Sequence, residues 1–150
     1  MAHSARFAAN AYASVDLATA VATASPHRLT LMLYDAALKN LDLVRSHMEA
    51  GRIAEKGEAM SRAMRIVNEG LKATLDLSQG DLAQNLNALY EYISTCLLKA
   101  NLHNDTVLLT EARSLLAGMR DTWMAIATEV HAPAMVAKAR AEFLRSAAAA

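Results

Sequence analysis

The chain has 150 residues, of which 54% are hydrophobic and only 5% aromatic, and its 15 basic and 15 acidic residues give a formal net charge of zero. This length suffices for one domain with its own core, and an apolar content dominated by alanine favours an all-α protein. The balanced charge argues against a nucleic-acid partner, and the lack of an uncharged apolar run of about 18 residues argues against a membrane span. Cys96 is the only cysteine, which excludes an intramolecular disulfide and favours a reducing, cytoplasmic location.

Residues 1–24 are expected to form an N-terminal strap ahead of the first helix. They carry Tyr12 and a few other apolar side chains among many Ala, Ser and Thr residues. A strap, a short helix and a partly disordered segment all fit this pattern. Asn10 and Asp16 interrupt the Ala-rich run, which argues against a cleaved secretory signal.

The first helix is predicted to start at Ser25. Its hydroxyl can accept a hydrogen bond at the N-cap, and Pro26 falls at the first helical position, where a missing backbone N–H costs nothing. Apolar residues then recur at three- and four-residue steps in four segments, which indicates helices. The four predicted helices run from Pro26 to about Ala50, Ile53 to about Leu75, Asp81 to about Ala100, and Asp105 to about Val130.

Short connections separate the predicted helices. Gly51 and Gly80 are typical helix ends, and Asn104 or Asp105 can cap the last helix. Connections of a few residues make consecutive helices antiparallel, so residues 25–131 are expected to form an antiparallel up-down four-helix bundle. In the last helix, the predicted core stripe consists of Leu108, Ala112, Leu115, Met119, Trp123, Ile126 and Val130.

Two parts of the chain depart from this regular pattern. Gly70 lies inside the predicted second helix, where glycine costs about 1 kcal/mol relative to alanine. A close approach by a neighbouring helix or partner and neutral drift explain it equally well. Residues 132–150 form an Ala-rich tail, for which a short fifth helix and a disordered segment are both open.

Most motifs that are typical of enzymes are absent from the sequence. The five histidines are scattered, and none stands three residues after a glutamate, as the paired motifs of helix-bundle metal sites require. No Cys-x-x-Cys, phosphate-binding glycine loop or nucleophile elbow occurs. We therefore expect no catalytic residue, no metal and no cofactor.

The tyrosines are the most suggestive polar residues. Tyr34 lies on the first predicted helix, and Tyr90 and Tyr92 lie on the third. On the third helix, Asn85, Ala88 and Tyr92 form a line that is rotated away from the core stripe and continues to Cys96 or Lys99. The first and third helices could share an outer groove for a partner. The alternative is that each tyrosine covers the core with its ring and meets water with its hydroxyl.

Several motifs together resemble the FliS family of flagellar export chaperones, which bind flagellin. The resemblance rests on Tyr12, on the run from Val21 through Ser25-Pro26 to Met32-Leu33-Tyr34-Asp35, and on the run from Asn85 to Ile93. It also includes the segment from Ile66 to Leu75, Ala100-Asn101 and Trp123, and thus spans about residues 12–126.

This resemblance implies a non-catalytic chaperone of the bacterial cytoplasm. It would hold the disordered C-terminal segment of flagellin, prevent premature polymerisation, and deliver the subunit to the type III export gate, with the strap around Tyr12 covering part of the client groove. The partner-binding residues are expected to be Tyr12, Leu29, Leu33, Tyr34, Asn85, Ala88, Leu89 and Tyr92. The alternative is a regulatory or scaffolding bundle that binds another flagellar or secretion protein, such as an anti-sigma factor. A monomer and a homodimer are both open for the free protein.

Overall fold

The computed structural model describes residues 18, 24–128 and 145, and within them it contains helices and no strands. Four long helices dominate: α2 (Pro26–Glu49), α3 (Ile53–Arg65), α4 (Asp81–His103) and α5 (Thr106–Thr128). Three short helical segments join α3 to α4: η1 (Ile66–Leu71), η2 (Lys72–Thr74) and η3 (Leu77–Gln79). The predicted all-α four-helix bundle is confirmed. The N-terminal strap with Tyr12 and the Ala-rich tail of residues 132–150 lie outside the described residues, apart from Ala18 and Arg145. The two alternatives for the tail, a short fifth helix and a disordered segment, both stay open.

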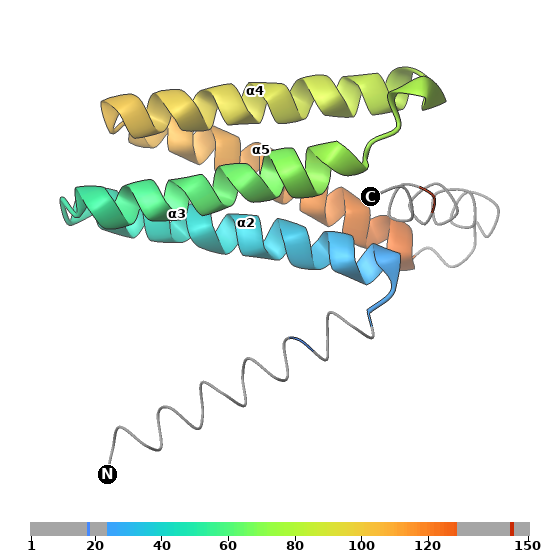
Figure 1. Cartoon of the computed structure of the whole chain (residues 1–150), viewed down its shortest axis with the longest axis horizontal. Coiled ribbons are helices and arrows are strands. Elements are labelled where there is room, and N and C mark those ends of the chain that lie inside the picture. The colour runs from blue at the N-terminus through green and yellow to red at the C-terminus, as the bar shows by residue number, and fades with distance from the viewer. Residues whose placement is uncertain (1–17, 19–23, 129–144, 146–150) are drawn as a thin grey trace, which may run out of the picture.

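Consecutive helices lie side by side with their connections at alternating ends of the bundle (Figure 1). α2 packs against α3 and α5, and α4 packs against α5 and, less extensively, against α3. α2 and α4 are therefore diagonal to each other across the bundle. Of the described helices, none combines the length and the apolar character that crossing a membrane requires.

The start of α2, the end of α4 and the start of α5 follow the local signals of the sequence. The Ser25 hydroxyl accepts a hydrogen bond from the backbone N–H of Arg28 at 3.2 Å, and Pro26 occupies the first turn of α2. α4 ends at Asn104, which adopts a left-handed conformation with φ of 50°. The carboxylate of Asp105 then accepts hydrogen bonds from the first backbone N–H groups of α5, at 2.9 and 3.1 Å. Asp105 is thus the cap of the last helix.

The core contains a buried stripe from every long helix. Its largest fully buried side chains are Leu41, Val44, Met60, Val67, Leu71, Ile93, Leu97, Leu109 and Leu116. On α5 the buried residues are Leu109, Ala112 and Leu116, whereas the predicted Leu108, Leu115, Met119 and Trp123 are only partly buried beside them. The predicted stripe is rotated because α5 packs against both α2 and α4, which buries a wider face than one line of residues covers.

The second helix does not continue regularly to Leu75 as predicted. Regular α-helix ends at Arg65, and a π-helical turn and a 3₁₀ turn follow. Ala63, Val67 and Leu71 are all essentially inaccessible. In an α-helix, residues spaced by four drift around the axis by about 40° per step, and a wider π turn offsets part of that drift. The π turn thereby keeps all three side chains directed into the core.

Gly70 lies within this π turn and against α2. A Cβ atom added at Gly70 would lie 3.3 Å from Cδ2 of Leu33. Of the two explanations for this glycine, the structure supports a close approach between helices.

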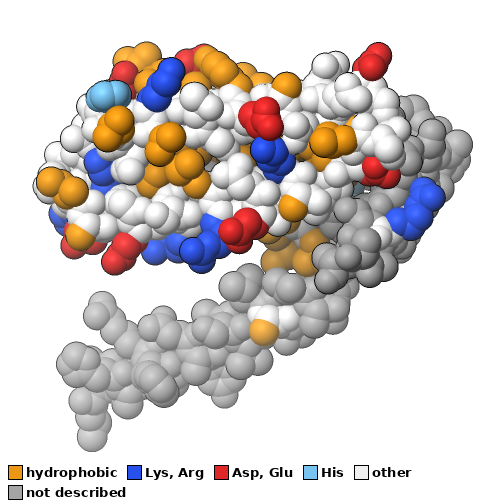
Figure 2. All heavy atoms as spheres, turned by 45° about the horizontal axis from the view of Figure 1, so that its top comes forward, with side chains coloured by type: hydrophobic (Ala, Val, Ile, Leu, Met, Phe, Trp, Pro, Cys, Tyr) orange, Lys and Arg blue, Asp and Glu red, His pale blue; other side chains and the backbone are white. Residues whose placement is uncertain are grey.

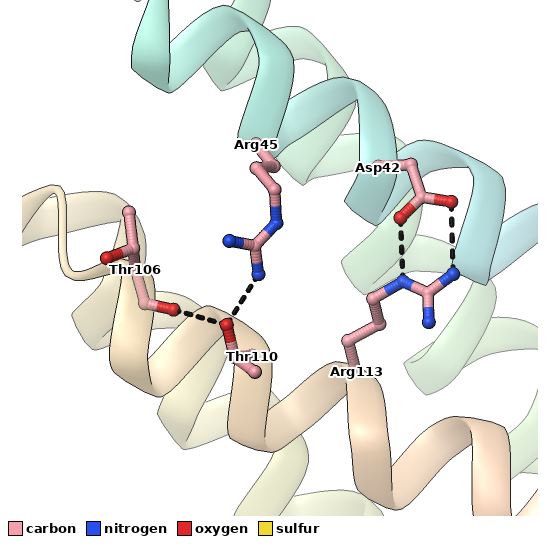
Figure 3. A network of polar contacts seen from close by, with 5 residues as sticks. All are labelled: Asp42, Arg45, Thr106, Thr110 and Arg113. Atoms are coloured by element: carbon pink, nitrogen blue, oxygen red, sulfur yellow. Dashed lines mark hydrogen bonds and ion pairs between the residues drawn. The ribbon is translucent and has the colours of Figure 1, made fainter.

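A polar network connects α2 to α5 along the surface (Figure 3). Arg113 forms a bidentate ion pair with Asp42, with N···O distances of 2.6 and 3.1 Å, and its hydrogen bond lowers the pKa of the Asp42 carboxyl. One turn away, Arg45 donates to the hydroxyl of Thr110 at 2.5 Å. Exposed pairs of this kind contribute at most about 1 kcal/mol each, so they set the register of α5 on α2 more than they stabilise the fold.

Candidate partner-binding site

Two of the three tyrosines that the structure describes lie inside the bundle. The hydroxyls of Tyr34 on α2 and Tyr90 on α4 are 2.5 Å apart and share a hydrogen bond, and both residues are at least 96% inaccessible, with exposed fractions of 4% and 3%. Burial raises the pKa of the Tyr34 phenol, and the hydrogen bond from Tyr90 offsets part of that rise. Burial is the main cause that raises the pKa of Tyr90 well above its ordinary value, and the neighbouring Tyr34 is the second cause. Both phenols are neutral and act as a polar link across the core.

Tyr92, the third described tyrosine, faces the surface. It is 47% exposed, and its hydroxyl donates a hydrogen bond of 2.6 Å to the carboxylate of Glu111 on α5. This hydrogen bond is the main cause that raises the pKa of the Tyr92 phenol. Tyr92 therefore bridges α4 and α5 on the outside of the bundle.

The other predicted residues of α4 lie on the same side as Tyr92. Asn85 and Ala88 are exposed and Leu89 is partly buried, at three- and four-residue steps before Tyr92. The line continues to the exposed Lys99, because Cys96 is buried with 4% exposure. The structure thus decides between the two continuations that the sequence left open.

On α5, helical spacing from Glu111 places Leu115 and Gly118 on the side that faces α4. Leu115 is partly buried against the core, and Gly118 is exposed with open space where a Cβ would stand. We define the α4–α5 face by Asn85, Ala88, Leu89 and Tyr92 on α4 and by Glu111, Leu115 and Gly118 on α5. It combines apolar side chains, an amide, a phenol and two small residues, which is a composition that a partner helix can approach closely.

The predicted residues of α2 are not part of this face. Leu33 packs toward Gly70 in η1, and Leu29 lies one turn earlier on the same side of α2. Both are partly buried, whereas Tyr34 is in the core. The prediction of an outer groove shared by the first and third helices is wrong, because α2 and α4 are diagonal. The partner-binding roles of Leu29, Leu33 and Tyr34 stay predictions.

The structure also brings together two residues that the sequence does not connect. The rings of His27 and Trp123 are stacked with centroids 4.8 Å apart. His27 donates from Nε2 to the carbonyl of Trp123 at 2.9 Å, and the indole of Trp123 donates to the carbonyl of His27 at 3.1 Å. The start of α2 is therefore fastened to the end of α5, a contact between residues 96 positions apart that no local pattern could indicate.

No candidate metal site occurs in the part of the chain that the structure describes. No three His, Cys, Asp or Glu side chains gather there in a group that could hold a metal ion.

Comparison with known proteins decides the family. The family model described as "Flagellar protein FliS" matches residues 8–130. The chain belongs to the FliS family. The resemblance seen in the sequence motifs is thereby confirmed, and the match ends before the Ala-rich tail.

Relatives within the FliS family cover most of the chain. It is 44% identical over 117 residues to the flagellar secretion chaperone FliS of Salmonella typhimurium, which is 77% of this chain and 87% of the relative. It is 40% identical over 113 residues to the flagellar secretion chaperone FliSB of Pseudomonas aeruginosa, with 75% and 89% covered. It is also 36% identical over 103 residues to FliS of Bacillus subtilis, with 69% and 76% covered.

Proposed function

We propose that this chain is a cytoplasmic flagellar secretion chaperone whose α4–α5 face binds the C-terminal segment of flagellin. Binding prevents premature polymerisation of flagellin, and the complex delivers the subunit to the export apparatus. The observation that carries the proposal is the α4–α5 face, with Tyr92 exposed between small residues, on a member of the FliS family. The relatives in Salmonella typhimurium, Pseudomonas aeruginosa and Bacillus subtilis bear the name of flagellar secretion chaperones, which supports the same role.

The physical demands of such a client match this face. A disordered segment that folds on binding loses conformational entropy, and it must bury apolar surface to compensate. Ala88 and Gly118 leave room for a client helix to approach the backbone of α4 and α5. Leu89 and Leu115 can make apolar contacts with the client helix. Asn85 and Tyr92 can form hydrogen bonds with polar groups of the client.

We extend the proposal to the other predicted residues. Leu29 and Leu33 lie on a different side of α2, so a client that contacts them as well would have to wrap around the bundle. The strap around Tyr12 would cover part of the client surface in the free protein. A non-enzymatic mode of action follows, since binding and release are all that this role requires.

Titration of the full chain with a peptide of the flagellin C-terminal segment tests the proposal. We expect a stoichiometric complex by size-exclusion chromatography and a gain of helical signal by circular dichroism. The matched variants are Ala88→Glu on the α4–α5 face and Ala54→Glu on α3, since both alanines are exposed on helices. Ala88→Glu should abolish binding, and Ala54→Glu should leave it unchanged. No interaction of the parent chain at tens of micromolar, with the bundle folded, would contradict the proposal.

A further inference from the structure

The hydrogen bond between Tyr92 and Glu111 places a negative charge on the α4–α5 face. The Tyr92 hydroxyl donates to Oε1 of the Glu111 carboxylate at 2.6 Å, and both residues are exposed. The carboxylate raises the pKa of the Tyr92 phenol, so the phenol is neutral and does not compensate the charge. Among the residues that the structure describes, no cation forms an ion pair with Glu111. Glu111 is therefore held by a neutral group, and its charge is open to a partner.

Elsewhere, carboxylates that bridge neighbouring elements are compensated within the chain. Each of them pairs with a cation, as Figure 3 shows for one pair: Asp35 with Arg120, Asp42 with Arg113, and Glu91 with Lys72. Arg113 and Arg120 follow Glu111 by two and nine residues, which places both on the opposite side of α5. The helix α5 thus directs arginines toward α2 and an unpaired carboxylate toward α4.

The surroundings of Glu111 favour one kind of cation. Tyr92 is 47% exposed, so part of its side chain can contact a ligand that reaches the carboxylate. Leu115 follows Glu111 by one helical turn and adds apolar surface. An arginine guanidinium is planar, stacks on aromatic rings and donates to both oxygens of a carboxylate, whereas lysine is a strongly hydrated point charge. A phenol beside a carboxylate therefore suits arginine better than lysine.

The charge of Glu111 acts locally rather than as part of a large field. In the view that brings α4 forward, the acidic and basic side chains among the coloured residues are scattered and form no large patch of one sign (Figure 2). Lys99 lies on the same line of α4 as Tyr92 and forms no ion pair with Glu111. A cation is thus selected by direct contact and not by long-range steering.

We propose that Tyr92 and Glu111 form an arginine-binding site on the α4–α5 face, to which the client segment presents an arginine. The guanidinium donates to both oxygens of Glu111 and lies against the ring of Tyr92, while the client backbone passes over Ala88 and Gly118, which leave room for it. The arginine selects the client and fixes its register on the face. The identity of the client rests on the proposed function, whereas the chemistry of the site does not.

A titration of the full, isotope-labelled chain, followed by NMR, tests the site with peptides that differ in one side chain. The peptide acetyl-Ala-Leu-Ala-Ala-Arg-Ala-Ala-Ala-Leu-Ala-amide carries the arginine, and its twins carry lysine or citrulline, a neutral isostere, in its place. We expect saturable shifts of the Tyr92, Glu111 and Gly118 backbone amides, and binding about fivefold weaker for both twins. Equal affinity of the peptides, or no shift up to about ten millimolar arginine peptide, would overturn the proposal.

A pair of variants separates the charge of Glu111 from its place in the fold. Glu111→Gln keeps an oxygen for the Tyr92 hydroxyl, so it should weaken the arginine peptide about fivefold and leave the citrulline peptide unchanged. Glu58→Gln is the matched control, since Glu58 is an exposed glutamate on α3 that forms no ion pair within the described chain. It should change neither affinity. An equal loss for both peptides in Glu111→Gln would show a structural role and refute the site.

The flagellin peptide then distinguishes this site from the proposed function. Replacing its arginines by citrulline one at a time should reveal one arginine whose loss makes binding insensitive to Glu111→Gln. Binding without such an arginine would overturn the inference and leave the proposed function standing. If the flagellin peptide does not bind while the arginine peptide binds through Glu111, the site is supported and the proposed function alone is contradicted. A dimer of the free chain that Glu111→Gln abolishes in sedimentation would overturn the inference, in favour of a second copy as the source of the arginine.

Discussion

The hydroxyls of Tyr34 and Tyr90 share a hydrogen bond of 2.5 Å across the centre of the bundle, between two helices that are diagonal to each other. Each phenol provides the polar contact that the other needs in an apolar interior, so their contribution to folding is mutual.

Removing both hydroxyls should cost less than the sum of the two single removals. Tyr34→Phe leaves the Tyr90 hydroxyl buried without its partner, and we expect a loss of about 1–3 kcal/mol in the free energy of unfolding. The double variant Tyr34→Phe/Tyr90→Phe replaces both polar groups and should be less destabilised than the sum of the single variants. Urea denaturation of the four proteins measures this cycle, and strictly additive losses would show that the hydroxyls do not depend on each other.

The same pair predicts a loss of stability in alkali. The pKa values of Tyr34 and Tyr90 are raised in the folded protein above the ordinary value of 10.0. Above that pH the unfolded chain loses phenol protons that the folded chain retains, so the free energy of unfolding should fall as pH rises. Below pH 10 the contribution is fully present. Denaturation curves between pH 8 and pH 11 should show the fall, and the double phenylalanine variant should show less of it. If the double phenylalanine variant showed the same pH profile as the parent chain, Tyr34 and Tyr90 would not be the cause of the loss of stability in alkali.

Gly70 offers a test of the contact between η1 and α2. Alanine has the better helix propensity by about 1 kcal/mol, and its Cβ would meet only the flexible end of Leu33 at 3.3 Å. Leu33 is partly buried and can shift by a few tenths of an ångström, so we expect Gly70→Ala to be neutral or stabilising by up to about 1 kcal/mol. Gly70→Leu should destabilise, because its longer side chain must displace Leu33. Thermal denaturation compares the three proteins, and a stable Gly70→Leu variant would show that the contact is not tight.

Deletion of residues 1–24 tests the proposed strap. The described bundle begins at the Ser25 cap, so we expect the shortened chain to stay folded with an unchanged helical signal. If the strap covers the client surface, its removal should change the affinity for the flagellin peptide. Tyr12→Ala in the full chain is the narrower variant and should shift the affinity in the same direction. Unchanged binding by both would remove the strap from the mechanism.

The candidate site was only partly predictable. Asn85, Ala88 and Tyr92 stand out in the sequence because helical spacing puts them on one line away from the core stripe. Glu111 and Gly118 have no comparable signal, since their relevance depends on α5 lying beside α4. The hydrogen bonds of Lys56 to Asn101 and Asn104 are still less predictable from the sequence, because they join residues that are 45 and 48 positions apart.

Local signals in the sequence are enough to predict four helices, the caps of the first and last of them, and their antiparallel order. These signals act over only a few residues, so they can be recognised in the sequence: the Ser25-Pro26 cap, the spacing of apolar residues and the short connections. Which helices are neighbours and which are diagonal depends on long-range packing. The arrangement of the helices depends on the simultaneous packing of all their apolar faces. As a result Tyr34 and Tyr90 lie in the core, whereas Tyr92 lies at the surface. Packing also imposed the π turn at Gly70, which helix propensity alone does not specify.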